Sequence, residues 1–207
     1  MYVPKHFEGD EATGRQIMQD HGWALLMTAD ADAAPVATHL ALVWQDDGSP
    51  HGSLIGHMAR ANQHWKLFAR GADSLALFWG PHAYVSPTWY TPGVKVPTWN
   101  YVTVHAYGRP QVVEDTEGAL DVLAMLAAVY EGSGAEAWSL DRLPPGNAQA
   151  QTKGIVAFRI PLTRVETKIK LSQNRDLEDR QRVIAKLEAS DSQDSQETAK
   201  WMKRVLP

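Results

Sequence analysis

Runs of apolar residues of strand length, separated by turn signals, characterise the first part of the chain. Residues 23–28 form one such run, and residues 35–44 partly alternate between apolar and polar side chains. Residues 46–49 (DDGS) are typical of a hairpin turn, which predicts a returning strand over residues 52–55. The turn-like residues 30–34 are expected to connect the first two strands. This pattern predicts antiparallel strands with short connections.

The later part of the chain alternates strand-like and helical stretches. Strands are predicted over residues 74–79, 82–86, 100–113, 155–160 and 163–170. A first helix is predicted between Asp10, which can cap it, and Gly22, which ends it, and a second over residues 59–69. A third is predicted from a cap at Asp115 or Thr116 through Tyr130. The charged tail from Asp176 is also predicted to be helical.

Short strands, tight turns and a few inserted helices predict a mainly β fold, an antiparallel barrel with peripheral helices. The βαβ alternation of nucleotide-binding folds is missing, and so are the loops G-x-G-x-x-G and G-x-x-x-x-G-K-[ST]. We expect one barrel domain over residues 1–175. Residues 176–207 are expected to form a helical C-terminal tail packed on or beside the barrel.

Composition and charge exclude several classes of protein. The 207 residues include no Cys, which excludes disulfides, zinc–thiolate sites and a cysteine nucleophile. No run approaches the ~20 apolar residues that a membrane span needs, so we expect a soluble, cytoplasmic protein. Residues 1–152 carry eight Lys and Arg against sixteen Asp and Glu, whereas residues 153–207 carry twelve against eight. This basic end suits nucleic acid, an anionic cofactor or the acidic part of a second subunit.

Residues 79–108 hold seven Trp and Tyr side chains, and the triplet Pro-Thr-Trp occurs in them twice, at residues 87–89 and 97–99. The intervening Thr-Pro-Gly is a strong turn signal. Flat amphipathic rings interleaved with polar side chains such as Ser86 and Asn100 suit a flat heteroaromatic ligand or a subunit interface. An aromatic-rich pair of strands in the barrel core explains the segment equally well.

Residues 57–62 (HMARAN) lie where a predicted strand passes into a predicted helix. The N–H groups of a helix start favour anions, and Arg60 can add a bidentate contact to a phosphate, with Asn62 nearby. The plainer alternative places Arg60 in a surface ion pair and leaves Asn62 as an exposed helix residue.

Metal binding and hydrolysis are poorly supported. The eight His residues include no pair at the spacing of a zinc-binding H-E-x-x-H motif, and Ser86 lacks the G-x-S-x-G context of a nucleophile. We therefore assign no metal ligands and no catalytic residues. Residues 168–175 (KIKLSQNR), with three cations, are either a solvated helix cap or an anion-binding or inter-subunit arm.

Several motifs in one order resemble the PaiB-type family of FMN-binding negative transcriptional regulators, across most of the chain. They are MYVP with HF at residues 1–7, THL at 38–40, GHMARAN at 56–62 with Trp65, GPHAYVSP at 80–87 with Trp89 and Tyr90, VPTWNY at 96–101 with Val104, His105 and Gly108, and KLSQNR at 170–175. The departures are small: Ala41 replaces the family's usual Pro, and Gln63-His64 replaces Pro-Gln.

The resemblance implies a split β-barrel like that of the pyridoxamine-phosphate-oxidase-like flavoproteins. It also implies a homodimer with two FMN sites at the subunit interface. Transcriptional repression, and with it DNA as a partner, rests on the resemblance alone. The site residues expected for FMN are Arg60, Asn62 and His57 at the phosphate, Ser86, Trp89 and Asn100 beside the ring, and Lys170 and Arg175 from the partner chain.

Two other classes of function remain open on this scaffold. One is an FMN-dependent oxidoreductase, because a fold does not determine a function. The other is a haem-handling or cofactor-free dimer, with His39, His57 or His105 as an axial ligand.

Overall fold

The computed structural model describes residues 1–29, 34–132, 134 and 136–207. The predicted turn at residues 30–34 therefore lies almost wholly outside the described residues. The strands are β1 (Trp23–Thr28), β2 (Val36–Gln45), β3 (Ser53–Ala59), β4 (Ser74–Val85), β5 (Thr98–Gly108), β6 (Gln111–Val112) and β7 (Ile155–Lys170). The α-helices are α1 (Glu11–Asp20), α2 (Thr116–Glu131), α3 (Asn147–Thr152), α4 (Leu177–Glu188) and α5 (Gln193–Arg204). Short 3₁₀ helices are η1 (Lys5–Phe7), η2 (Gln63–Arg70), η3 (Pro87–Trp89) and η4 (Leu140–Arg142).

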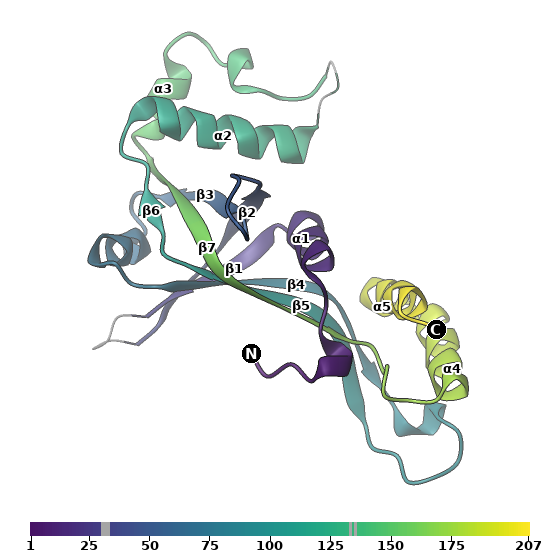
Figure 1. Ribbon diagram of the computed structural model, residues 1–207. Coiled ribbons are helices and arrows are strands. Elements are labelled where there is room, and N and C mark those ends of the chain that lie inside the picture. Colours follow the sequence, from purple (N-terminus) through teal and green to yellow (C-terminus); the bar gives the residue numbers. More distant parts are fainter. Residues whose placement is uncertain (30–33, 133, 135) are drawn as a thin grey trace. The chain divides into compact units, whose positions relative to one another are not determined.

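The strands form one sheet that closes on itself. The order among the described residues is β3-β2-β1-β4-β5-β7-β6, and β3 also pairs with β7 (Figure 1). The pairings of β1 with β2 and β4, and of β3 with β2 and β7, are all antiparallel. This ring of strands confirms the predicted antiparallel barrel with helices at its periphery.

The chain divides into two compact units, and each is described by itself. Unit 1 consists of residues 1–17, 79–104 and 166–207, and unit 2 of residues 18–78 and 105–165. Strands β4, β5 and β7 contribute to both units. The predicted tail, residues 176–207, is part of unit 1.

The core of unit 2 lies between helix α2 and strands β2, β3 and β7. Its buried side chains are Val43, Ile55, Ala119, Val122, Leu126 and Ala157. Asp115 caps α2 by accepting a hydrogen bond from the N–H of Gly118 at 2.7 Å, which satisfies one of the free donors at the helix start. Figure 1 shows α3 next to the beginning of α2.

In unit 1, the charged tail forms two helices rather than one. Helices α4 and α5 lie against each other, and Ser192 begins α5 by accepting a hydrogen bond from the N–H of Ser195 (Figure 1). Met202 of α5 is fully buried and accepts a hydrogen bond from the Asn100 side chain of β5. The tail is therefore packed on a strand of its own unit.

Several predicted boundaries were wrong. The strands predicted over residues 74–79 and 82–86 are the single strand β4, and those over 155–160 and 163–170 are the single strand β7. Pro81 and Pro161 each lie within a continuous strand. The predicted long strand over residues 100–113 is divided at Arg109 and Pro110 into β5 and β6.

The helix predicted over residues 59–69 is also different in the structure. Strand β3 continues to Ala59, because this residue still pairs with Ile155 of β7. A 3₁₀ helix, η2, then begins only at Gln63. The residues expected at a helix start are therefore a strand end and a turn.

Candidate functional site

Arg60 lies directly after β3 and is exposed, but its side chain is anchored. Its Nε donates to the carbonyl of Lys153 at 2.9 Å, and its Nη2 donates to the carbonyl of Ile155 at 2.6 Å. Its backbone N–H also donates to the carbonyl of Gly154. Since a guanidinium carries five N–H donors, the rest of the group remains available to an anion.

Asn62 determines the shape of the turn after Arg60. Its side-chain oxygen accepts from the backbone N–H of His64 at 3.0 Å, and its Nδ2 donates to the Thr38 hydroxyl at 3.1 Å. The side chain thus occupies the free donor at the start of η2 and links the turn to strand β2. Its expected contact with a phosphate stays a prediction.

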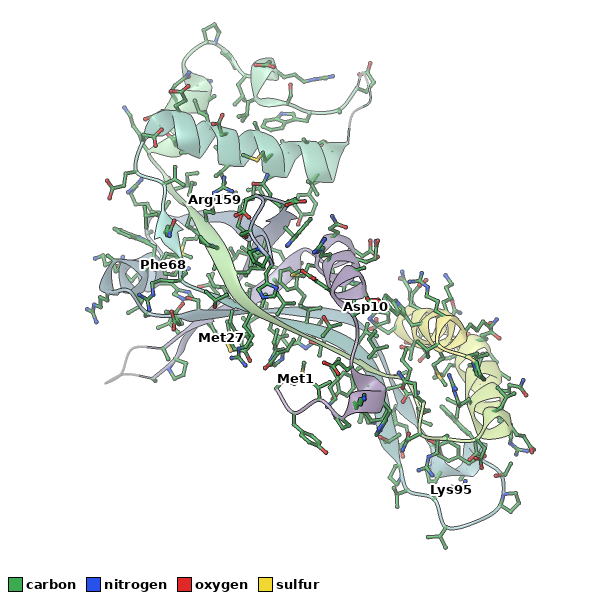
Figure 2. The ribbon with its side chains drawn as sticks, in the orientation of Figure 1. Met1, Asp10, Met27, Phe68, Lys95 and Arg159 are labelled. Carbon is green, nitrogen blue, oxygen red and sulfur yellow. The ribbon has the colours of Figure 1, made fainter. Side chains whose placement is uncertain are left out.

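His64 is a structural residue that the sequence analysis did not single out. Its side chain is 1% exposed, and its Nδ1 and Nε2 each lie 2.8 Å from a hydroxyl oxygen, that of Thr38 and that of Thr28. Burial lowers the pKa of His64, so the ring is held neutral between β1 and β2. Phe68, labelled in Figure 2, has its ring centroid 5.5 Å from that of His64. The network fixes the turn that follows Arg60.

His57 lies on β3, three residues before Arg60, and lines a pocket of about 480 Å³ on the α2 side of the strand. Its Nδ1 is buried, and no described group forms a hydrogen bond with it. Burial lowers the pKa of His57, which keeps the imidazole neutral near pH 7. A neutral imidazole lacks the charge that would attract a phosphate, although it keeps one N–H donor. The expected phosphate contact of His57 stays a prediction.

Gly56 permits the close approach of β2 and β3 beside this pocket. A Cβ at this position would lie 2.7 Å from Cδ2 of Leu42 and 3.0 Å from the carbonyl oxygen of Ala41. Leu42 is the residue paired with Gly56 across the two strands. The close packing of β2 and β3 therefore explains why the GHMARAN motif has a glycine at this position.

The residues expected beside the flavin ring lie in unit 1. Ser86 caps η3 by accepting from the N–H of Thr88 at 3.3 Å, and the half-buried Trp89 accepts at its carbonyl from Arg182 at 3.0 Å. Asn100 is 0% exposed. Its Oδ1 accepts from the Ser172 hydroxyl at 3.1 Å, and its Nδ2 donates to a sulfur atom of α5. Asn100 therefore connects β5 to the tail, and its contact with a ring stays a prediction.

Lys170 is the last residue of β7, and Arg175 lies in the turn between β7 and α4, both in unit 1. Lys170 donates to the Thr98 hydroxyl and to the carbonyl of Trp99, and Arg175 lies 5.1 Å from the centroid of the Tyr90 ring. Burial, with the charges of Lys168 and Arg175, lowers the pKa of Lys170. Neither Lys170 nor Arg175 forms an ion pair with any residue that the structure describes. Both stay candidates for an anionic partner.

Unit 2 thus brings together three of the eight expected cofactor residues, on and just after one strand. Within the described ranges, no group of His, Asp and Glu side chains is arranged to hold a metal ion. The same residues include no helix that is long and apolar enough to span a membrane.

Sequence comparisons identify related proteins. Residues 1–164 match the family described as "Putative FMN-binding domain". Over its whole length the chain is 35% identical to the "Protease synthase and sporulation protein PAI 2" of Bacillus subtilis, covering 98% of that protein. The cofactor expected from the sequence, FMN, is therefore the one that the family description names.

Comparison with solved structures supports the fold. The flavocytochrome Anf3 of Azotobacter vinelandii matches with a TM-score of 0.64 and 14% identity, over 86% of this chain and 77% of that one. The FAD and haem binding protein of Mycobacterium smegmatis matches with a TM-score of 0.60 and 15% identity, over 84% and 77% of the two chains. At these identities the likeness concerns the fold alone, which is the split barrel expected from the sequence.

Proposed function

Since this chain belongs to the family of FMN-binding domains that includes PaiB-type proteins, we propose that it is an FMN-binding negative transcriptional regulator that acts as a homodimer. The match of residues 1–164 and the full-length similarity to the PAI 2 protein support this proposal.

The observation that carries the proposal is the exposure and the hydrogen bonding of the Arg60 side chain. Its guanidinium is oriented by two backbone carbonyls, is exposed, and keeps unused N–H donors. An oriented guanidinium binds a phosphate through charge-assisted hydrogen bonds, and its orientation costs little further entropy on binding. These features fit the phosphate of FMN. Asn62 holds the turn that presents Arg60.

When bound, FMN supplies the redox chemistry, while the protein supplies binding, orientation and electrostatics. In this proposal Ser86 and Trp89 border the ring. Asn100 joins them only if α5 shifts, because the side chain is buried under Met202. Lys170 and Arg175 approach from the partner chain, and their lack of a carboxylate partner among the described residues supports that role.

Large exposed aromatic side chains support a dimer. In unit 1, Trp79, Tyr84 and Trp99 are about half exposed, and the Trp99 ring lies 5.9 Å from that of Tyr84. In unit 2, Trp23 is exposed and stacks on His39. Exposed aromatic clusters of this kind are enriched at protein interfaces.

The regulatory role rests on family membership, and several cations of the tail are already paired with carboxylates. Cations of α4 and α5 form ion pairs with neighbouring carboxylates, in the pairs Arg182–Glu178, Lys200–Glu197 and Lys203–Glu188. A DNA-binding surface normally presents unpaired cations on one face. We therefore expect any DNA contact to involve surfaces other than this helix pair.

The proposal is tested by FMN titration of the purified protein, followed by its absorption spectrum and by light scattering. We expect flavin bands at saturation and a mass of twice 22.9 kDa. The matched variants are Arg60→Ala and Lys66→Ala, which each remove one exposed cation near η2. Only Arg60→Ala should weaken FMN binding. Wild-type protein that binds no FMN, or that is monomeric at micromolar concentration, contradicts the corresponding part of the proposal.

A further inference from the structure

We propose that the pocket beneath α2 binds an uncharged, mainly apolar small molecule that carries a single hydrogen-bonding group, which meets the imidazole of His57. This site is separate from the contact of Arg60 with the FMN phosphate, and the proposal does not depend on FMN binding.

The pocket has the size and the lining of a small-molecule site. Its volume of about 480 Å³ falls within the ~300–1,000 Å³ that is usual for such sites. The apolar side chains that line it come from β2, α2, β7 and the connection after α2. They are Ala41, Leu123, Leu126, Ala127, Trp138, Leu140, Leu143 and Ile155.

His57 provides the polar contact. Its side chain lines the pocket among mostly apolar neighbours, and no described group forms a hydrogen bond with its Nδ1. A ligand group that forms a hydrogen bond with the imidazole would meet a ring that has kept its capacity to donate or accept. The other polar lining residues, Tyr130, Glu131 and Gln151, are exposed at the mouth. The interior therefore offers one polar contact.

The charge of the lining disfavours an anion. Among the described residues that line the pocket, Glu131 alone is charged, and it would repel a phosphate or a sulfonate. The flavin ring is also a poor match, because its polar edge presents several hydrogen-bonding atoms and the interior pairs only one. Each polar atom left unpaired on burial would weaken binding.

Ala41 offers a way to fill the pocket from strand β2. It is half-buried on β2, at the position where the resemblance implies a Pro, and its small side chain leaves the pocket open. Ala41→Phe would occupy this space. Ala37→Phe is the matched control, because Ala37 lies four residues earlier on the same strand and is exposed. Trp138→Ala removes an exposed wall at the mouth and provides a second variant that leaves the core intact.

Two fluorescent probes test the proposal on the full-length protein. N-phenyl-1-naphthylamine is uncharged and has one N–H group, and 1-anilinonaphthalene-8-sulfonate has the same rings with an added sulfonate. We expect the uncharged probe to bind at one molecule per chain and at least about tenfold more tightly than the sulfonate. Ala41→Phe and Trp138→Ala should each weaken its binding, and Ala37→Phe should leave it unchanged. Glu131→Gln should reduce the preference for the uncharged probe.

Several results would overturn the proposal. Equal binding of the uncharged probe to Ala41→Phe and Ala37→Phe would place it elsewhere, and equal binding of both probes would remove the charge argument. Displacement of the probe by FMN, together with weaker FMN binding by Ala41→Phe, would make the pocket the flavin slot. A changed oligomeric state in Ala41→Phe would assign the pocket to a subunit interface. The failure of FMN binding alone would leave the probe results unaffected.

Discussion

Asp179 in unit 1 and His57 in unit 2 are both ionisable groups with buried polar atoms, but their hydrogen bonding differs. Asp179 has a side chain that is 1% exposed and accepts three hydrogen bonds, from the N–H and hydroxyl of Thr91 at 2.7 and 2.8 Å and from Lys95 at 2.7 Å. Nδ1 of His57 has no described partner. A buried polar group whose hydrogen bonds are all formed stabilises the fold, whereas one without a partner costs stability.

Asp179 holds the loop between η3 and β5 against helix α4. Lys95, labelled in Figure 2, lies on this loop, and its neighbours Val94 and Val96 are exposed. Burial raises the pKa of Asp179, but the hydrogen bonds from Lys95 and Thr91 outweigh it and lower the pKa to about 2. The charged carboxylate is thus the form that the fold stabilises.

The largest effect on stability is expected when Asp179 is removed. Asp179→Ala leaves the Lys95 ammonium without its carboxylate in a mostly buried place, and we expect a loss of about 3 kcal/mol in the free energy of unfolding. Denaturant titration measures this loss. The control is Asp176→Ala, since Asp176 is exposed and its side chain makes no capping hydrogen bond. Equal losses in both variants would show that the three hydrogen bonds of Asp179 contribute little.

Acid should weaken the same interaction. Because the folded pKa of Asp179 is lowered, its contribution is present above the unfolded value of 3.8 and is lost as the pH falls through about 2. We expect about 1–2 kcal/mol, allowing for screening by solvent. The measurement compares unfolding of the wild type and Asp179→Asn between pH 6 and pH 2. The two curves should converge at low pH, and parallel curves would contradict the assigned pKa.

The smallest effect is expected at His57. His57→Phe removes a buried nitrogen that has no partner and keeps an aromatic ring against the pocket wall. The free energy of unfolding should stay the same or rise by up to ~1 kcal/mol. In the same variant, binding of N-phenyl-1-naphthylamine should weaken. A loss of stability as large as that of Asp179→Ala would abolish the contrast between the two groups.

The two Pro-Thr-Trp triplets show why part of the fold was not predictable. Residues 87–89 form the 3₁₀ helix η3, because Ser86 caps it, whereas Thr98 and Trp99 of the second triplet begin strand β5. The triplets are identical, but Ser86 precedes the first and Val96 precedes the second. The second triplet becomes part of a strand through pairing with β4 and β7, which are distant in sequence, and such pairing has no local signal.

Some predicted strand boundaries were wrong for a related reason. Strand β4 continues through Pro81, and strand β7 continues through Pro161, although proline lacks the N–H that a sheet uses. The antiparallel barrel itself was predictable, because alternation and tight turns are local features. The tail divides into two helices at Ser192, which caps α5. A single serine is a weak local signal for a helix start, so the sequence did not reveal this division.

The candidate site was partly predictable. Arg60 was singled out because a strand was expected to pass into a helix there, whereas the structure places it, exposed, in the turn between β3 and η2. The carbonyls that orient it belong to Lys153 and Ile155, more than ninety residues away, so no local pattern reveals them. The buried position of Asn100 was missed because a polar residue in an aromatic segment looks accessible. The pocket at His57 was also missed, since most of its walls come from α2 and the following connection.

The most direct test of the FMN proposal compares FMN with riboflavin, which has the same ring system and no phosphate. The affinities of both ligands are measured for the wild type and for Arg60→Ala by titration at one salt concentration. Arg60→Ala should lose about 1.5–3 kcal/mol, or roughly one to two decades, in FMN affinity, because a charge-assisted contact is removed. Riboflavin affinity should not change. An equal loss for both ligands, or no loss for FMN, would contradict the assignment of the phosphate to Arg60.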